Sequence, residues 1–142
     1  MTIAVILQDR SGAIYNAQQG ETVATVATRL AEHKIGALPI MDGEKLVGIF
    51  SERDVIYGLA AHGGEMLAKS VGDVMTAEPI TVTSETPILS ALSLMTRRRI
   101  RHLPVMDGDN LTGFVSIGDL VKHRIEKIEA EATAMRDYIQ MA

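Results

Sequence analysis

Cysteine is absent from the sequence, and the residue types that build catalytic or metal centres are not grouped in it. Without cysteine the chain can form no disulfide, no thiolate zinc site and no cysteine nucleophile. The four histidines lack metal-ligand spacing, and no serine has the partners of a hydrolytic triad. We therefore expect neither a metal site nor a catalytic residue, and we predict that the protein is not an enzyme.

Long hydrophobic runs are also missing. The apolar run at residues 3–7 is too short for the core of a signal peptide and follows no basic segment. No other run approaches the roughly 20 residues that a membrane helix needs. These absences predict a cytoplasmic protein that makes no membrane contact.

Positive charge is in the minority, because 14 lysines and arginines face 18 aspartates and glutamates, for a formal net charge of −4. Nucleic acids are bound mainly by neutralising their phosphates, so the overall balance disfavours them as partners. The stretch RRRIRH at residues 97–102 is locally basic. Aromatic residues make up only 4% of the chain and none is interleaved with this stretch, which disfavours a nucleic-acid interface there too.

What the sequence does contain is an internal repeat, in which Leu38 and Asp54 align with Leu103 and Asp119. The segment LPIMDGEKLVGIFSERD at 38–54 lies over LPVMDGDNLTGFVSIGD at 103–119, and nine of the 17 positions are identical. One unit of roughly 60 residues is marginal as a lone domain. We therefore expect two units that pack their sheets and helices on each other about a pseudo-twofold axis.

Each copy predicts the order helix, strand, turn, strand, helix. Strands expected at 37–41 and 46–50 are joined by an Asp-Gly turn, and the pattern repeats at 102–106 and 111–115. The first helix of each copy is predicted by apolar residues with i, i+3, i+4, i+7 spacing. These residues are Val23, Val26, Ala27 and Leu30 in one copy, and Ile88, Ala91, Leu92 and Met95 in the other. The result is an α/β fold in which each unit is a small β-sheet flanked by helices.

The chain divides into a first unit at 1–69, a second at 70–124 and a C-terminal amphipathic helix at 120–142. Apolar residues of this helix are spaced 4, 3, 4, 3, 4, as in a heptad seam: Val121, Ile125, Ile128, Ala132, Met135 and Ile139. The seam is shorter than three heptads, so an independent coiled coil is disfavoured. The helix either packs on the core of its own chain or pairs with a second chain, which would make the protein a homodimer.

The two aligned segments, 38–54 and 103–119, both end on the pattern glycine, two apolar residues, serine, two variable residues, aspartate. A serine between strand and helix caps the helix, and an aspartate three residues later can complete a capping box. The same helix N-terminus can bind an anion, and a carboxylate beside it can accept hydrogen bonds from ribose hydroxyls. Ser51, Asp54, Ser116 and Asp119 are therefore candidates for capping or for a nucleotide site.

These motifs resemble the CBS domain, the module named after cystathionine β-synthase, and the tandem resembles a Bateman module. The resemblance rests on the two serine–aspartate patterns, the two LP-[IV]-MDG stretches, the helix starts GET and ETP, and VGDVMT at 71–76. It covers the chain to about residue 121. The sequence is most similar to short stand-alone bacterial members and to a plant organellar group, which also have a long terminal helix.

The resemblance implies an adenine nucleotide as ligand, AMP first, with ADP, ATP or NAD(H) as alternatives and S-adenosylmethionine in some members. It implies that Asp54 and Asp119 hold ribose hydroxyls and that Ser51 and Ser116 bind phosphate. The base would lie in an apolar slot with a few polar groups. The residues implied around the base are Tyr15, Asn16, Ile35, Ile80, Thr81 and Ile100.

The two copies are not equivalent at the phosphate positions. In the family, cations before the strand meet the phosphate, which gives this role to Arg101 and His102; the first copy has Gly-Ala there. Arg53, by contrast, aligns with a glycine, and Pro104 of the LP motif completes the candidate set. Either Arg101 and His102 reach across to the first site beside Arg53, or one site is strong and the other weak or suited to another ligand. A histidine near phosphate predicts binding that tightens as pH falls through its pKa.

Three hypotheses follow for the function. The first is a non-enzymatic nucleotide sensor in which the ligand shifts the relative pose of the units and the affinity for a separate partner protein. The second is a structural dimerisation scaffold with degenerate nucleotide sites. The third is an enzyme, for which the sequence offers no nucleophile, base or metal cluster.

Overall fold

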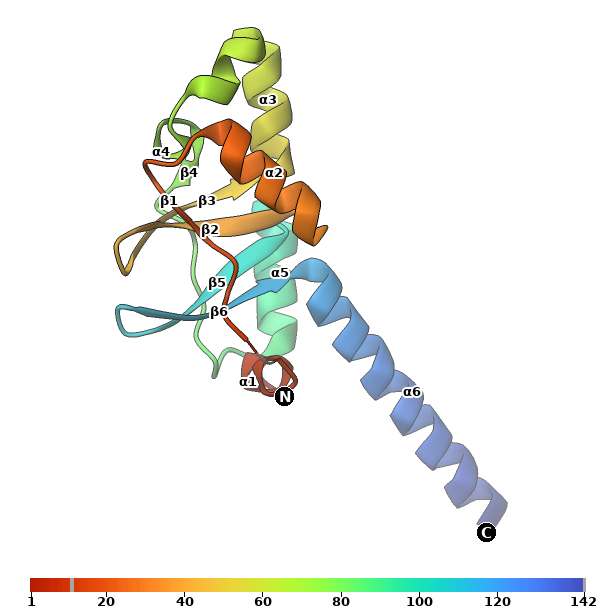
Figure 1. Cartoon of the computed structure of the whole chain (residues 1–142). Coiled ribbons are helices and arrows are strands. Elements are labelled where there is room, and N and C mark those ends of the chain that lie inside the picture. The colour runs from red at the N-terminus through yellow and green to blue at the C-terminus, as the bar shows by residue number, and fades with distance from the viewer. Residues whose placement is uncertain (11, 142) are drawn as a thin grey trace.

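The computed structural model describes residues 1–10 and 12–141, and it confirms an α/β fold of two small sheets flanked by helices and a long terminal helix (Figure 1). In chain order the elements are α1 (Ile3–Gln8), β1 (Ala17–Gln18), α2 (Val23–His33), β2 (Ala37–Asp42), β3 (Lys45–Ser51), α3 (Glu52–His62), the 3-10 helix η1 (Gly63–Ala68), α4 (Val71–Val74), β4 (Thr76–Ala77), α5 (Ile88–Arg98), β5 (His102–Asp107), β6 (Asn110–Ser116) and α6 (Ile117–Met141).

The two units share a central hairpin with a parallel neighbour, although the first sheet has four strands and the second has two. In the first, the sheet order is β1-β2-β3-β4, with β1 parallel to β2 and an antiparallel β2–β3 hairpin. In the second, the β5–β6 hairpin has its register shift at the equivalent position, between Val105 and Met106. Val82 bridges in parallel to Val105, as Ala17 pairs with Ile40. The structure therefore repeats in the same alignment as the sequence.

Each unit has its own apolar core. The predicted helix faces are confirmed, because Val23, Val26 and Leu30 are buried on α2, as are Ile88, Ala91 and Met95 on α5. The first cluster is completed by Ala17, Leu38, Ile40, Phe50, Met66 and Val71. The second is completed by Ile3, Ile6, Val82, Leu103, Val105, Val115 and Leu120. Ile3 and Ile6 lie before β1 in the sequence but are buried in the core of the second unit.

Two short segments, which we call straps, each cover a unit: residues 1–8 and residues 69–75. The Val71 N–H donates to the Glu21 carbonyl at 2.7 Å, and the Ile3 N–H donates to the Thr86 carbonyl at 3.0 Å. Glu21 and Thr86 are equivalent in the two repeats, so Ile3 and Val71 are equivalent positions of the two straps. The segment 1–69, assigned to the first unit from the sequence, thus includes a helix that covers the second.

The first helix of each unit ends on a residue with left-handed backbone conformation that is not glycine. Lys34 has φ 53° and Arg99 has φ 55°, and both follow the last helical residue. The next N–H groups, of Ile35 and Ile100, return to carbonyls of the helix. This turn directs the chain from the helix into the central hairpin of each unit.

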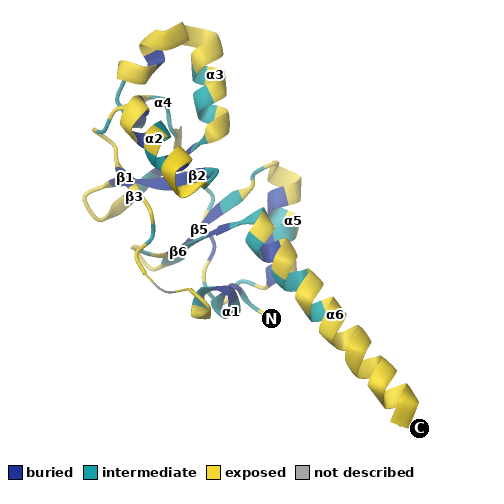
Figure 2. Ribbon diagram, turned by 45° about the vertical axis from the view of Figure 1, so that its right-hand side comes forward, coloured by how far each residue is buried: buried dark blue, intermediate teal, exposed yellow. Residues whose placement is uncertain are grey.

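The units meet through their sheets, while α6 leads away from them. The equivalent strands β3 and β6 contact each other, as a pseudo-twofold arrangement requires. Figures 1 and 2 show α6 projecting from the body, with its C-terminal end far from both sheets. Leu120 is the only buried residue in the described length of α6. The alternative in which the heptad seam packs on its own core is therefore wrong.

No helix within residues 1–10 and 12–141 is both long enough and apolar enough to cross a membrane.

Candidate functional site

A cleft of about 710 Å³ opens between the two units, within the range of small-molecule sites. Both units and the segment after α1 contribute to it. Its apolar and small lining residues are Leu7, Gly12, Ala13, Ile14, Tyr15, Ile35, Gly36, Ala37, Gly113, Phe114 and Ile117. Its polar and charged lining residues are Arg10, Lys34, Glu52, Arg101, His102, Thr112, Ser116 and Asp119.

Asp119 lies in this cleft at the N-terminus of α6. Its Oδ2 accepts a hydrogen bond from the Ser116 N–H at 2.8 Å, and the Asp119 N–H donates to Ser116 Oγ at 3.1 Å. This is the capping box that the serine–aspartate spacing predicts. A carboxylate can accept several hydrogen bonds, so capping leaves Asp119 able to accept more from a ligand.

Arg10 also binds this carboxylate. Its Nη2 lies 2.5 Å from Asp119 Oδ2, and its Nη1 donates to the Phe114 carbonyl at 2.6 Å. Burial raises the pKa of Asp119, but the Ser116 N–H and the Arg10 guanidinium outweigh it, so the pKa lies below its ordinary value. The cleft therefore holds Asp119 ionised at neutral pH, as an acceptor for hydroxyl groups.

His102 joins the two units inside the cleft. Its ring stacks on Phe114 with centroids 5.6 Å apart, and a Cβ added to Gly36 would lie 3.4 Å from its Cε1. Burial lowers the pKa of His102, while the carboxylates of Asp119 and Glu52 oppose that shift and Arg101 adds to it. The imidazole is thus neutral above its ordinary pKa and becomes a cation only in more acidic solution.

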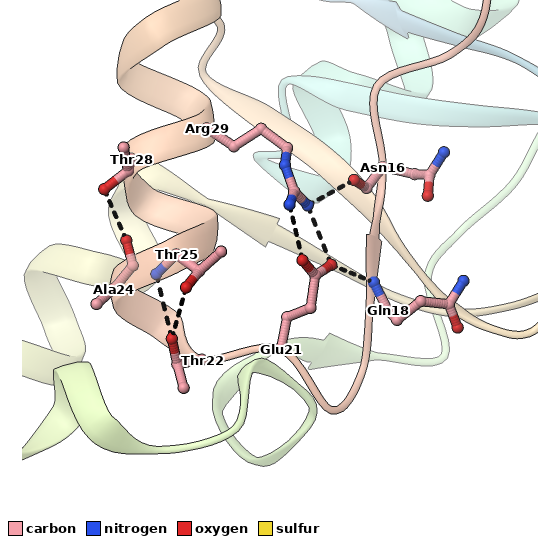
Figure 3. A network of polar contacts seen from close by, with 8 residues as sticks. All are labelled: Asn16, Gln18, Glu21, Thr22, Ala24, Thr25, Thr28 and Arg29. Carbon is pink, nitrogen blue, oxygen red and sulfur yellow. Dashed lines mark hydrogen bonds and ion pairs between the residues drawn. The ribbon is translucent and has the colours of Figure 1, made fainter.

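An ion-pair network lies directly after the segment that forms one wall of the cleft. Figure 3 shows this network. Arg29 forms two hydrogen bonds to the Glu21 carboxylate, at 2.7 and 3.0 Å, and donates to the Asn16 carbonyl at 2.9 Å. Glu21 in turn accepts from the Gln18 N–H at 2.8 Å. The hydrogen bond from Arg29 lowers the pKa of Glu21 despite partial burial. The network fixes the start of β1, directly after the wall residues Gly12 to Tyr15.

The charges of the cleft differ from those of the whole chain. Three basic side chains, Arg10, Lys34 and Arg101, share the cleft with two carboxylates, Glu52 and Asp119, in a protein of formal net charge −4. Apolar side chains such as Ile35 form the rest of the wall. Such a site suits a ligand with an apolar ring, hydroxyl groups and a negative group.

The structure brings only part of the predicted site together. Tyr15, Ile35, Arg101, His102, Ser116 and Asp119 line the cleft. Arg101 and His102 therefore lie with the aspartate of their own unit, and not with Asp54. Ile80 and Ile100 pack against the second core, and Pro104 is buried in β5, where its carbonyl accepts from Val82. Asn16 and Thr81 are exposed, and neither is among the lining residues of this cleft.

The equivalent residues of the first unit lie outside this cleft. Ser51 caps α3 in a capping box with Asp54, whose Oδ2 accepts from the Ser51 N–H at 2.9 Å. Asp54 Oδ1 accepts from Thr76 Oγ1 at 3.4 Å. Arg53 is exposed on the first turn of α3. A second cavity, of about 640 Å³, lies between α2 and α3 and includes neither Ser51 nor Asp54 in its lining.

Some cleft residues were not found from the sequence. Arg10 lies outside the repeated segments, and no local pattern marks it. Lys34, Glu52 and Phe114 stand beside predicted positions, but no local pattern marks them as lining residues of the cleft. Gly36 was noted only as the position that lacks a cation, whereas it lies against the His102 ring in the cleft.

Comparison with known proteins agrees with the repeat and the fold. The family model described as "CBS domain" matches residues 15–61 and 71–126. A curated relative, the CBS domain-containing protein CBSX3, mitochondrial, of Arabidopsis thaliana, is 38% identical over 125 residues, which cover 84% of this chain and 61% of the relative. The chain thus spans about three-fifths of that relative's length.

Two solved structures are also similar. A protein with CBS domains from Burkholderia ambifaria MC40-6 superposes with a TM-score of 0.83 at 36% identity, covering 89% of this chain and 95% of the other. CBSX2, solved in complex with AMP, superposes with a TM-score of 0.74 at 26% identity, covering 88% of this chain and 96% of the other.

Proposed function

The chain belongs to the CBS domain family, and from this premise we propose that it is a sensor of adenine nucleotides that binds its ligand in the cleft at Asp119. The observation that carries the proposal is the cleft itself. It combines an ionised carboxylate, cations and an apolar wall in one cavity of about 710 Å³. The AMP complex of CBSX2, a structural neighbour, supports an adenine nucleotide.

Each part of a nucleotide has a suitable partner in the cleft. The ribose hydroxyls would donate to Asp119, whose lowered pKa keeps it an acceptor. The phosphate would lie near Ser116, Arg101 and His102, at the N-terminus of α6, where free N–H groups and the helix dipole favour an anion. The base would lie against Ile35 and the segment before β1.

We place the main site at Asp119 and a weaker one at Asp54. The Asp119 site has Arg101 and His102 in its cleft. The residues that match them in the first unit are Gly36 and Ala37. Those two residues instead line the Asp119 cleft and add no charge to it. One tightly bound AMP per chain is therefore the expected stoichiometry, with ADP, ATP and NAD(H) as competing ligands.

The ligand would act by changing the contact between the units. The cleft is lined by Glu52 from the first unit, Ser116 from the second and Arg10 from the segment after α1. A ligand that touches all three favours the arrangement in which they are close, and it changes partner binding only as far as it binds two arrangements differently. The regulated partner would be a separate protein, met in the cytoplasm.

We further propose that α6 pairs with α6 of a second copy. Its heptad seam is apolar yet exposed, with exposed fractions of 40% at Val121, 50% at Ile125 and 59% at Met135. A seam of this kind is covered best by an identical seam. Sedimentation equilibrium should show a dimer for the wild type and a larger dissociation constant of the dimer for Ile125→Glu. A monomeric wild type would contradict the pairing.

The direct test of the sensor is calorimetric titration of nucleotide-stripped protein with AMP, ADP, ATP, NADH and S-adenosylmethionine in turn. We expect micromolar binding of an adenine nucleotide and no turnover of ATP or NADH. Binding weaker than millimolar for every ligand would contradict the sensor and favour the alternative, a dimerisation scaffold with degenerate sites.

A further inference from the structure

Arg10 binds the Asp119 carboxylate, the group that the proposed function assigns to the ribose hydroxyls. Its guanidinium contacts Asp119 Oδ2 at 2.5 Å and also donates to the Phe114 carbonyl at 2.6 Å. The Arg10 side chain is 41% exposed, so it can leave without breaking the core. A ribose and Arg10 therefore compete for one carboxylate.

We propose that Arg10 is a specificity-determining residue, a latch on Asp119 that makes the cleft select phosphorylated ligands over the bare nucleoside. A nucleoside that displaces the Arg10 guanidinium from Asp119 gives the guanidinium no other anion to bind. A nucleotide offers its phosphate, which a guanidinium binds with two parallel hydrogen bonds. This inference rests on the proposed function, because it assigns a role at the same site.

The cleft gives the released guanidinium a short path to the phosphate. Arg10 lines the same cavity as Ser116, Arg101 and His102. Its main chain is held, because its N–H donates to the Leu7 carbonyl at 3.2 Å and Leu7 lies against Gly113 of β6. The exchange therefore needs rotation of the Arg10 side chain and no movement of α1.

The first unit carries the opposite charge at the matching position. The straps are equivalent, because Leu7 and Met75 lie against the equivalent glycines Gly113 and Gly48. Three residues beyond this pair, Arg10 corresponds to Glu78. Asp54 accepts a hydrogen bond from the neutral hydroxyl of Thr76, where Asp119 has a guanidinium. The latch thus belongs to the Asp119 site.

The test compares adenosine with AMP by calorimetry, in the wild type, in Arg10→Gln and in Arg136→Gln. Arg136→Gln removes the same charge from the exposed far part of α6 and serves as the matched control. In Arg10→Gln we expect adenosine to bind up to about five-fold tighter, since an exposed ion pair is weak. We expect AMP to bind about ten-fold weaker, since a charged hydrogen bond to phosphate is lost.

The deciding quantity is the ratio of the two dissociation constants, adenosine over AMP, which should fall at least ten-fold in Arg10→Gln and stay unchanged in Arg136→Gln. A ratio that stays the same in Arg10→Gln, with AMP still bound by the wild type, overturns the latch alone. A wild type that binds neither ligand overturns the proposed function, and the latch with it. If Arg10→Gln lowers the melting temperature by several degrees, Arg10→Lys replaces it: the ammonium keeps the charge but loses the planar fork, so the ratio should still fall.

Discussion

At the scale of single residues, His102 couples the chemistry of the cleft to pH. Its pKa is lowered by burial against Phe114 and Gly36, so the unliganded cleft gains this positive charge only below the ordinary value of 6.5. A bound phosphate favours the charged imidazole. We predict that AMP affinity rises as pH falls from 7.5 to 5.5 more steeply in the wild type than in His102→Gln. Calorimetry at four pH values measures the affinity. Because the AMP phosphate titrates equally with both proteins, the difference between wild type and His102→Gln reports His102 alone. Parallel plots of affinity against pH would contradict the role of His102.

The same shift predicts how stability changes with pH. The pKa of His102 is lower in the folded chain than in the unfolded one, so the unfolded chain binds more protons between the two values. Stability is therefore fully present above the ordinary pKa of 6.5 and falls as pH drops through the folded pKa. Urea unfolding at pH 7.5 and 5.5 should show that the free energy of unfolding falls less for His102→Gln than for the wild type. An equal loss in both proteins would mean that His102 does not contribute.

Two glycines test how tightly the straps lie on the sheets. A Cβ at Gly48 would lie 2.8 Å from the Thr76 carbonyl oxygen and would also meet the Met75 side chain, whereas at Gly113 it would meet only the flexible end of Leu7. Gly48→Ala should therefore lower the free energy of unfolding by about 2 kcal/mol, and Gly113→Ala by less. Denaturant unfolding of both variants measures the difference. The reverse order would contradict the placement of β4 beside β3.

Residue roles were predictable where one local pattern contained them. The serine–aspartate spacing identified both capping boxes, and the family motif identified Asp119, Arg101 and His102 as cleft residues. Arg10 could not be found, because its contact with Asp119 joins residues that are distant in the sequence and has no repeat to mark it. The family resemblance placed Ile80 and Ile100 beside the base, whereas in the structure they pack against the second core.

At the scale of elements, the backbone at the end of α5 is strained, and one substitution can relieve this strain. Arg99 has φ 55°, a conformation that glycine adopts without strain and that side chains with a Cβ rarely do. Arg99 is exposed and not among the lining residues of the Asp119 cleft. We predict that Arg99→Gly raises the free energy of unfolding by up to about 1 kcal/mol. Thermal unfolding measures it, and a lower midpoint would mean that the arginine side chain stabilises the helix end by contacts.

Long periodic elements were predictable and short ones were not. The i, i+3, i+4, i+7 spacing identified α2 and α5, and the Asp-Gly turns identified both hairpins. The helix α1 and the two-residue strands β1 and β4 are too short to show a period. The run at 3–7 becomes helical because it packs on Ile88 and its neighbours in the second unit, which lie far along the chain.

At the scale of the whole molecule, the strap from α1 makes the second unit depend on the N-terminus. Ile3 is fully buried in the second core, as its equivalent Val71 is in the first. Ile3→Ala should lower the free energy of unfolding by about 2–4 kcal/mol, while Leu89→Ala, at a residue 59% exposed, should have little effect. Denaturant unfolding tests both. A neutral Ile3→Ala would show that α1 does not belong to the second core.

The central claim is that one adenine nucleotide binds between the units at Asp119. The most direct measurement is calorimetric titration of AMP into the wild type, Asp119→Asn and Asp54→Asn; asparagine keeps a carbonyl for the capping box in both variants. We predict that AMP affinity falls about ten- to a hundred-fold in Asp119→Asn, since a charged acceptor for the ribose hydroxyls is lost. Affinity should stay within about two-fold in Asp54→Asn, since a residue outside the main site is changed. Full affinity in Asp119→Asn, or loss in Asp54→Asn alone, would contradict the claim.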